Sequence, residues 1–91
     1  MDLIFGDVVI LGVCLDISES GLRGTFSHPV PVGTEGLLTL YHSDETYQVH
    51  TFIDSFRNDE VRARFRFESE QERLRIRGLI KLLTGPLPPR R

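Results

Sequence analysis

Short apolar runs separated by turn residues fill the first two thirds of the chain, a pattern typical of β-strands. The region 27–33 holds two prolines and a glycine and is predicted to be irregular, whereas the polar residues 42–45 are predicted to join two strands of a hairpin. Gly12 is predicted to mark a bulge. The predicted strands are Leu3–Phe5, Val8–Leu15, Leu22–Phe26, Glu35–Tyr41, Thr46–Asp54 and Glu60–Phe67.

Alternation is clearest in the last of these strands, where apolar residues and arginines take alternate positions. The apolar positions are Val61, Ala63, Phe65 and Phe67, and the positions between them are Arg62, Arg64 and Arg66. One face of this strand is therefore expected to be buried. The arginine face could serve as a basic stripe for an anionic partner, but we expect it to be solvated and partly neutralised by Glu60, Glu68 or the opposite strand.

After Phe67 the period changes to that of a helix, predicted over residues 69–84. Ser69 and Glu72 have the spacing of a capping box, and Gly85 with Pro86 supplies a stop. The predicted buried face is Ile76, Leu79, Ile80 and Leu83. Leu74 and Leu82 lie off this face, which indicates either a wide contact with the strands or a second face for a partner or another copy.

Five or six antiparallel strands followed by one amphipathic helix predict a single domain over residues 1–84. A small sheet avoids exposed edges by curling into a barrel, and the helix then covers one open end or one face. The fold class is therefore mainly β, a small antiparallel barrel with one C-terminal helix. Residues 85–91, rich in Pro and Arg, are predicted to form an extended, mobile tail.

Composition narrows the classes of function. The net charge of −2 gives no general attraction to DNA or to an anionic membrane, although Arg23 is the only Lys or Arg before residue 57. The single cysteine, Cys14, excludes an internal disulfide and fits a reducing compartment. No apolar run is long enough to span a bilayer, and no signal peptide is recognisable, so we expect a cytoplasmic protein without membrane insertion.

Catalytic and metal-binding patterns are absent from the sequence. His28, His42 and His50 lack the spacing of metal ligands, and Ser18 and Ser20 are not part of a nucleophile elbow. We therefore expect no enzymatic activity, no metal and no cofactor.

A polar corner between the second and third predicted strands is the strongest functional signal. Asp16, Ser18 and Gly21 follow one another at offsets of two and three. Asp and Ser can accept hydrogen bonds from nearby backbone N–H groups, and glycine allows a positive φ or a close approach by another group. The corner therefore either stabilises a bend or presents polar atoms to a ligand. A carboxylate of Asp16 that caps buried donors would make Asp16→Ala costly by about 1–3 kcal/mol, whereas a free one would not.

In this context the corner resembles the Asp/Asn-x-Ser-x-x-Gly motif of the PilZ domain family. Pro29, Pro31 and Gly33 resemble the family's link to the next strand, and the stretch 65–72 is similar to its Phe-containing strand and Glu-rich helix start. The resemblance extends from about Val8 to Leu83. It implies a six-stranded Greek-key barrel and a bacterial signalling module that binds cyclic di-GMP and relays it to a partner.

The resemblance also implies roles for individual residues. Asp16, Ser18 and Gly21 would face a guanine, and Arg23, the arginine nearest in sequence, is the candidate phosphate contact. The family's Arg-x-x-x-Arg arm is missing from residues 1–7.

Three explanations of the missing arm stay open. The domain binds the nucleotide poorly, the arm lies upstream of Met1, or other arginines replace it. The candidates for replacement are Arg62 with Arg66, Arg73 with Arg77, and Arg90 with Arg91. The alternative function is a degenerate module that acts through protein contacts or self-association. A nucleic-acid-binding barrel is disfavoured by the even charge balance.

Overall fold

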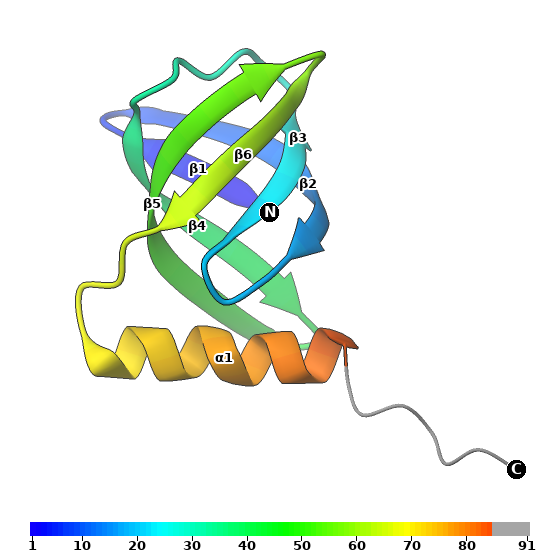
Figure 1. Ribbon diagram of the computed structural model, residues 1–91, viewed down its shortest axis with the longest axis vertical. Coiled ribbons are helices and arrows are strands. Elements are labelled where there is room, and N and C mark those ends of the chain that lie inside the picture. Colours follow the sequence, from blue (N-terminus) through cyan, green and yellow to red (C-terminus); the bar gives the residue numbers. More distant parts are fainter. Residues whose placement is uncertain (85–91) are drawn as a thin grey trace, which may run out of the picture.

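The computed structural model describes residues 1–84 and consists of a closed antiparallel barrel followed by a helix (Figure 1). The elements are β1 (Asp2–Phe5), β2 (Val8–Ile17), β3 (Gly21–Phe26), β4 (Glu35–His42), β5 (Glu45–Arg57), β6 (Glu60–Phe65) and α1 (Glu70–Thr84). The predicted fold class is confirmed. The prediction for residues 85–91 lies outside the described residues.

The strand order around the barrel is β1-β2-β3-β6-β5-β4. Consecutive hairpins join β1, β2 and β3, and the chain then returns through residues 27–34 so that β4 pairs with β1, which is a Greek-key connection. This topology makes β6 the neighbour of β3, with Arg62 opposite Arg23. In Figure 1, α1 lies across one end of the barrel, the end at which the turn between β2 and β3 is found.

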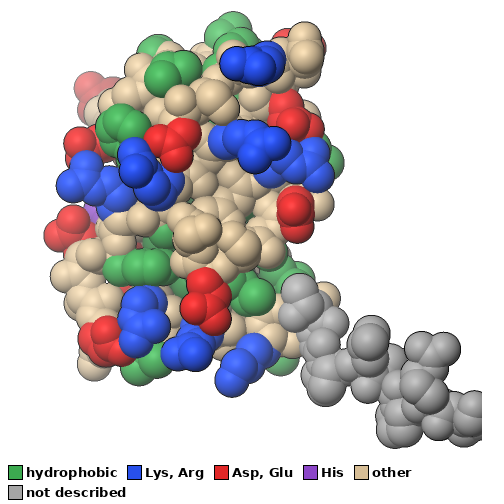
Figure 2. Space-filling model, in the orientation of Figure 1, with side chains coloured by type: hydrophobic (Ala, Val, Ile, Leu, Met, Phe, Trp, Pro, Cys, Tyr) green, Lys and Arg blue, Asp and Glu red, His purple; other side chains and the backbone are tan. Residues whose placement is uncertain are grey.

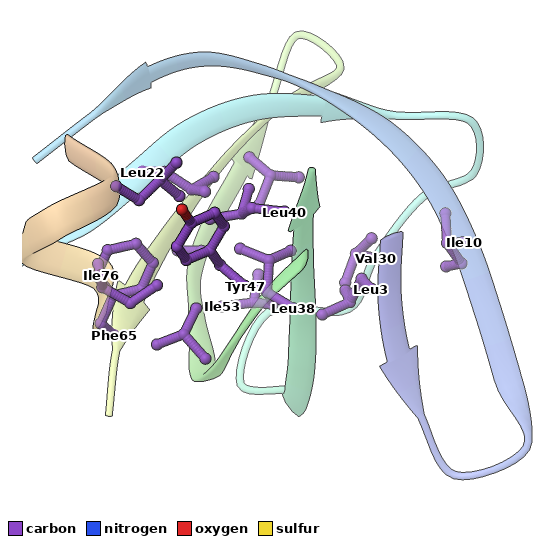
Figure 3. Packing of buried hydrophobic residues seen from close by; sticks show 14 residues of the cluster. Leu3, Ile10, Leu22, Val30, Leu38, Leu40, Tyr47, Ile53, Phe65 and Ile76 are labelled. Carbon is purple, nitrogen blue, oxygen red and sulfur yellow. The ribbon is translucent and has the colours of Figure 1, made fainter. Parts of the chain in front are cut away.

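The barrel interior is filled by apolar side chains from every strand, and α1 seals it with Ile76 and Leu79, each 1% exposed (Figure 3). The predicted alternation in β6 is confirmed for Val61, Ala63 and Phe65, which are buried between exposed arginines. The strand ends at Phe65, two residues before its predicted end, and Phe67 is only partly buried. The other buried apolar residues are Leu3, Ile10, Leu22, Val30, Leu38, Leu40, Tyr47, Val49 and Ile53.

Leu83 was predicted to be buried, and this prediction is wrong. Its side chain is 47% exposed, because the last turn of α1 borders an open apolar pocket between β2 and β4. Leu82 and Leu74, which lie off the predicted face, are also exposed. The contact of the helix with the barrel is therefore narrower than its apolar composition suggests.

The bulge in β2 lies between Cys14 and Asp16, not at Gly12 as predicted. Gly12 has another role, because a Cβ there would lie 2.4 Å from the Thr25 carbonyl oxygen and 2.5 Å from the Phe26 ring. The glycine thus allows Phe26 to pack against the strand. β2 also continues two residues past its predicted end, through Ile17.

Hydrogen bonds of the Glu72 side chain connect the start of α1 to the barrel. Ser69 Oγ accepts a hydrogen bond from the Glu72 backbone N–H at 3.1 Å, which confirms that half of the predicted capping box. The Glu72 carboxylate does not complete the box by accepting from Ser69. It accepts from the backbone N–H groups of Glu68 and His50, and it lies 2.8 Å from His50 Nδ1 on β5.

This connection predicts an acid-sensitive contribution to stability. Partial burial raises the pKa of the Glu72 carboxyl, but the hydrogen bonds from Glu68 and His50 outweigh it, so the pKa lies below its ordinary value of 4.5. A carboxyl with a lower pKa in the folded state stabilises the fold above its unfolded pKa, and the stabilisation is lost as the pH falls through the folded pKa. We expect Glu72→Gln to reduce the free energy of unfolding by about 1–2 kcal/mol at neutral pH and by almost nothing in strong acid.

Urea unfolding of both proteins across the acid range measures this difference. Glu70→Gln is the control, because its ion pair with Arg73 is solvent-exposed and its removal is expected to change stability much less. A Glu72→Gln effect that stays constant from neutral to strongly acidic pH would contradict the role given to the carboxylate.

Candidate functional site

The corner joins β2 to β3 and consists of residues 16–21. In the β2–β3 ladder Cys14 opposes Gly24, but the next pair is Asp16 with Arg23, so Leu15 is the additional residue of a bulge. A bulge redirects the side chains that follow it. Asp16 is consequently exposed and lies beside Arg23 on the outer surface of the barrel.

Ser18 holds the turn itself. Its backbone N–H donates to the Gly21 carbonyl at 2.8 Å, and its hydroxyl lies 3.3 Å from the same oxygen and accepts from the Ser20 N–H at 3.4 Å. The Ser20 carbonyl in turn accepts from the backbone N–H of Phe65 on β6 at 2.9 Å. The hydroxyl of Ser18 therefore has a structural function, while its exposed position leaves it accessible to a ligand.

Gly21 is required by a close backbone approach. A Cβ at this position would lie 2.1 Å from the Ala63 carbonyl oxygen of β6, and the φ angle of Gly21 is not positive. Of the two roles considered from the sequence, close approach is the one that the structure has.

All four residues predicted from the corner line one open pocket of about 380 Å³, a size within the range of small-molecule sites. We call it the corner pocket. Its lining residues are Asp16, Ile17, Ser18, Ser20, Gly21, Leu22, Arg23, Asp54, Arg62, Ala63 and Arg64. The pocket thus brings Arg62 and Arg64 of β6 to the corner. The sequence had placed both on a solvated strand face and had named Arg62 only together with Arg66 as a replacement for the missing arm.

The charges of the corner pocket are only partly paired. Arg23 Nη1 lies 2.6 Å from Glu60 Oε2, and Arg64 Nη2 lies 2.9 Å from Asp54 Oδ1. Arg64 also stacks over Phe52, with its Cζ 5.2 Å from the ring centroid. Within residues 1–84, no hydrogen bond or ion pair engages the side chain of Asp16 or that of Arg62. The pocket therefore offers one free carboxylate and one free guanidinium.

Arg66, Arg73 and Arg77 form ion pairs outside the corner pocket. Arg66 lies 3.2 Å from Glu35 of β4, and Arg64 pairs with Asp54 of β5, so neither of these arginines pairs with Glu60 or Glu68. On the face shown in Figure 2, Lys and Arg side chains form several groups with Asp or Glu beside them, and no continuous basic surface appears.

Neither described Arg-x-x-x-Arg pair is brought into the pocket as a pair. Arg62 lines it without Arg66. Arg77 lies 3.3 Å from Glu19 in the corner turn, whereas Arg73 pairs with Glu70. The third pair, Arg90 with Arg91, lies outside the described residues.

Comparison of the chain with family models, with curated proteins and with solved structures found no match. In the part of the chain that the structure describes, no helix has the length and apolarity to cross a membrane, and no three His, Cys, Asp or Glu side chains gather as a metal site.

Proposed function

We propose that this protein is a non-enzymatic signalling module of the PilZ type that binds cyclic di-GMP in the corner pocket and relays the signal to a partner. The observation that carries the proposal is the convergence of Asp16, Ser18, Gly21 and Arg23 on one pocket together with Arg62. The closed barrel and its C-terminal helix agree with the fold that the resemblance implies.

In this proposal, the carboxylate of Asp16 recognises the guanine base. A carboxylate accepts two parallel hydrogen bonds from the N–H groups on one edge of guanine, and adenine does not offer that pair. The Asp16 carboxylate is exposed, unpaired within residues 1–84 and directed to the outer surface by the bulge. It needs no rearrangement before it binds.

In this proposal, Arg62 binds the phosphate and Arg23 does not. A guanidinium presents a planar pair of donors that matches two phosphate oxygens. Arg23 already donates to Glu60 at 2.6 Å, so a phosphate would have to compete with that carboxylate. Arg62 lines the same pocket and has no such competitor within residues 1–84. Arg62 thus supplies a cation of the kind that the Arg-x-x-x-Arg arm, which is not found in residues 1–7, provides in the family.

Calorimetric titration of the full chain with cyclic di-GMP tests the proposal. We expect Asp16→Ala and Arg62→Ala each to weaken binding about 10- to 100-fold, since each removes charge-assisted hydrogen bonds. Because Asp16 is exposed and unpaired within residues 1–84, its substitution is expected to change the free energy of unfolding by less than about 0.5 kcal/mol.

Two controls make the titration specific. Arg66→Ala removes an arginine from the same strand face outside the corner pocket, so binding should be almost unchanged. Cyclic di-AMP should bind more weakly than cyclic di-GMP to the wild type and about equally to Asp16→Ala. No heat with either nucleotide up to millimolar concentration would reject nucleotide binding and favour the alternative function, action through protein contacts.

A further inference from the structure

The outer face of β2 is apolar from Val9 to Leu15. Val9, Leu11, Val13 and Leu15 are 58%, 63%, 60% and 49% exposed. We call these four residues the β2 stripe. The solvent face of an antiparallel strand normally carries polar residues, as the arginines of β6 do here. No charged residue interrupts the β2 stripe, whose side chains stand about 7 Å apart and form one continuous row.

The stripe continues into an apolar pocket at the end of β2. This pocket has a volume of about 450 Å³ and is bordered by Val13 and Leu15 of the stripe, by Tyr41 of β4 and by Leu83 of α1. Tyr41 and Leu83 are 56% and 47% exposed. The pocket exists because β1 pairs with β2 only as far as Leu11 and with β4 only as far as Thr39, so β2 and β4 both extend beyond the end of β1.

The combined surface is large for a monomer. Six apolar side chains, each about half exposed, present on the order of 600 Å², whereas the largest apolar patch on a typical monomer is about 300–600 Å². A stable interface buries about 800 Å² on each partner. The stripe and its pocket, with a polar rim, supply an area of this size.

We propose that the β2 stripe is the interface through which two copies of this chain form a symmetric dimer. The row is uncharged and can be self-complementary, because a two-fold axis near Leu11 and Val13 places each half of the row against the other half of its copy. An antiparallel arrangement separates the two Asp16 carboxylates to opposite ends and leaves both corner pockets open. This proposal does not depend on nucleotide binding.

A lipid surface is the competing occupant, and the charge beside the stripe disfavours it. Membrane-surface binding by an apolar patch is normally assisted by Lys and Arg at its rim. Here Asp2 on the neighbouring strand lies opposite Leu11, where it accepts a hydrogen bond from the Tyr41 hydroxyl, and Asp16 follows Leu15 directly. The carboxylates of Asp2 and Asp16 repel anionic headgroups, and Arg23, which lies beside Asp16, is already paired with Glu60.

Sedimentation equilibrium and light scattering of the full chain test the dimer. We expect a mass of twice 10.4 kDa for the wild type and 10.4 kDa for Leu11→Glu, with the dimer dissociation constant raised at least about 100-fold by a buried unpaired charge. Val9→Glu is a second variant on the same row. Both side chains are exposed in the monomer, so circular dichroism should report an intact fold.

Leu74→Glu is the matched control, since Leu74 is 49% exposed but belongs to α1 and not to the stripe. It should leave the dimer intact. A monomeric wild type at millimolar concentration would overturn the proposal, as would a dimer that Leu74→Glu dissociates and Leu11→Glu does not. Co-sedimentation of a monomeric wild type with phosphatidylcholine vesicles, abolished by Leu11→Glu, would assign the stripe to a lipid surface instead.

Discussion

Gly21→Ala is expected to lower the free energy of unfolding by about 3 kcal/mol, the upper end of the range for overpacking. The added methyl would lie 2.1 Å from the Ala63 carbonyl oxygen, which is backbone and cannot move aside as a flexible side chain does. Both backbones are fixed by the ladder between β3 and β6, in which Gly21 opposes Arg64 and Leu22 opposes Ala63. Thermal and urea unfolding measure the loss, and for a domain of this size it corresponds to a melting temperature lower by more than about 10 °C.

Gly78→Ala is the matched control for this substitution. Gly78 lies in α1, and a Cβ there would meet nothing within 4 Å. Because alanine has a higher helix propensity than glycine, this variant should be more stable than the wild type by about 0.5–1 kcal/mol. If Gly21→Ala were as stable as the wild type, the close contact between β3 and β6 would be refuted.

The contrast between Gly21 and Asp16 divides the corner into two functions. Gly21 and Ser18 are used by the fold, one for the approach to β6 and the other for the turn. Asp16 makes no such bond within residues 1–84. The corner therefore stabilises a bend through Ser18 and Gly21 and leaves the carboxylate of Asp16 accessible. The two roles predicted from the sequence thus fall to different residues, and the ligand role of Asp16 is the part that the titration tests.

Local patterns predicted the elements of this fold well. Alternation in β6 correctly separated buried Val61 and Phe65 from the exposed arginines, because a strand directs successive side chains to opposite faces. The Ser69 cap located the start of α1. The bulge was misplaced because Gly12 satisfies the local criterion, whereas the irregularity at Leu15 depends on how β2 pairs with β3.

The site was predicted less completely, for a physical reason. Asp16 and Arg23 are close in sequence, and one hairpin brings them together. Arg62 reaches the same pocket only because β6 pairs with β3, a long-range contact for which no local pattern exists. Arg62 was therefore considered only as half of an Arg-x-x-x-Arg pair with Arg66, whereas the structure brings it to the corner without Arg66.

Ile76→Ala is expected to cost about 3 kcal/mol of unfolding free energy, within the range measured for removal of a buried isoleucine. Ile76 is 1% exposed and lies near Phe65 and Tyr47 where α1 meets the end of the barrel (Figure 3). Truncation leaves a cavity there that the rigid barrel wall cannot fill, so both lost burial and lost packing contribute. Denaturant unfolding followed by far-ultraviolet circular dichroism measures the change.

Leu74→Ala, in the same helix, separates burial from helix propensity. Leu74 is 49% exposed, so its truncation should change stability by less than about 0.5 kcal/mol. Equal losses for the two variants would mean that α1 does not dock through Ile76.

If the docking is as described, Ile76→Ala should also loosen the corner turn, since Glu19 lies 3.3 Å from Arg77 of the same helix. Amide hydrogen exchange of residues 18–20 should then be faster in Ile76→Ala than in Leu74→Ala, which connects the position of the helix to the state of the pocket.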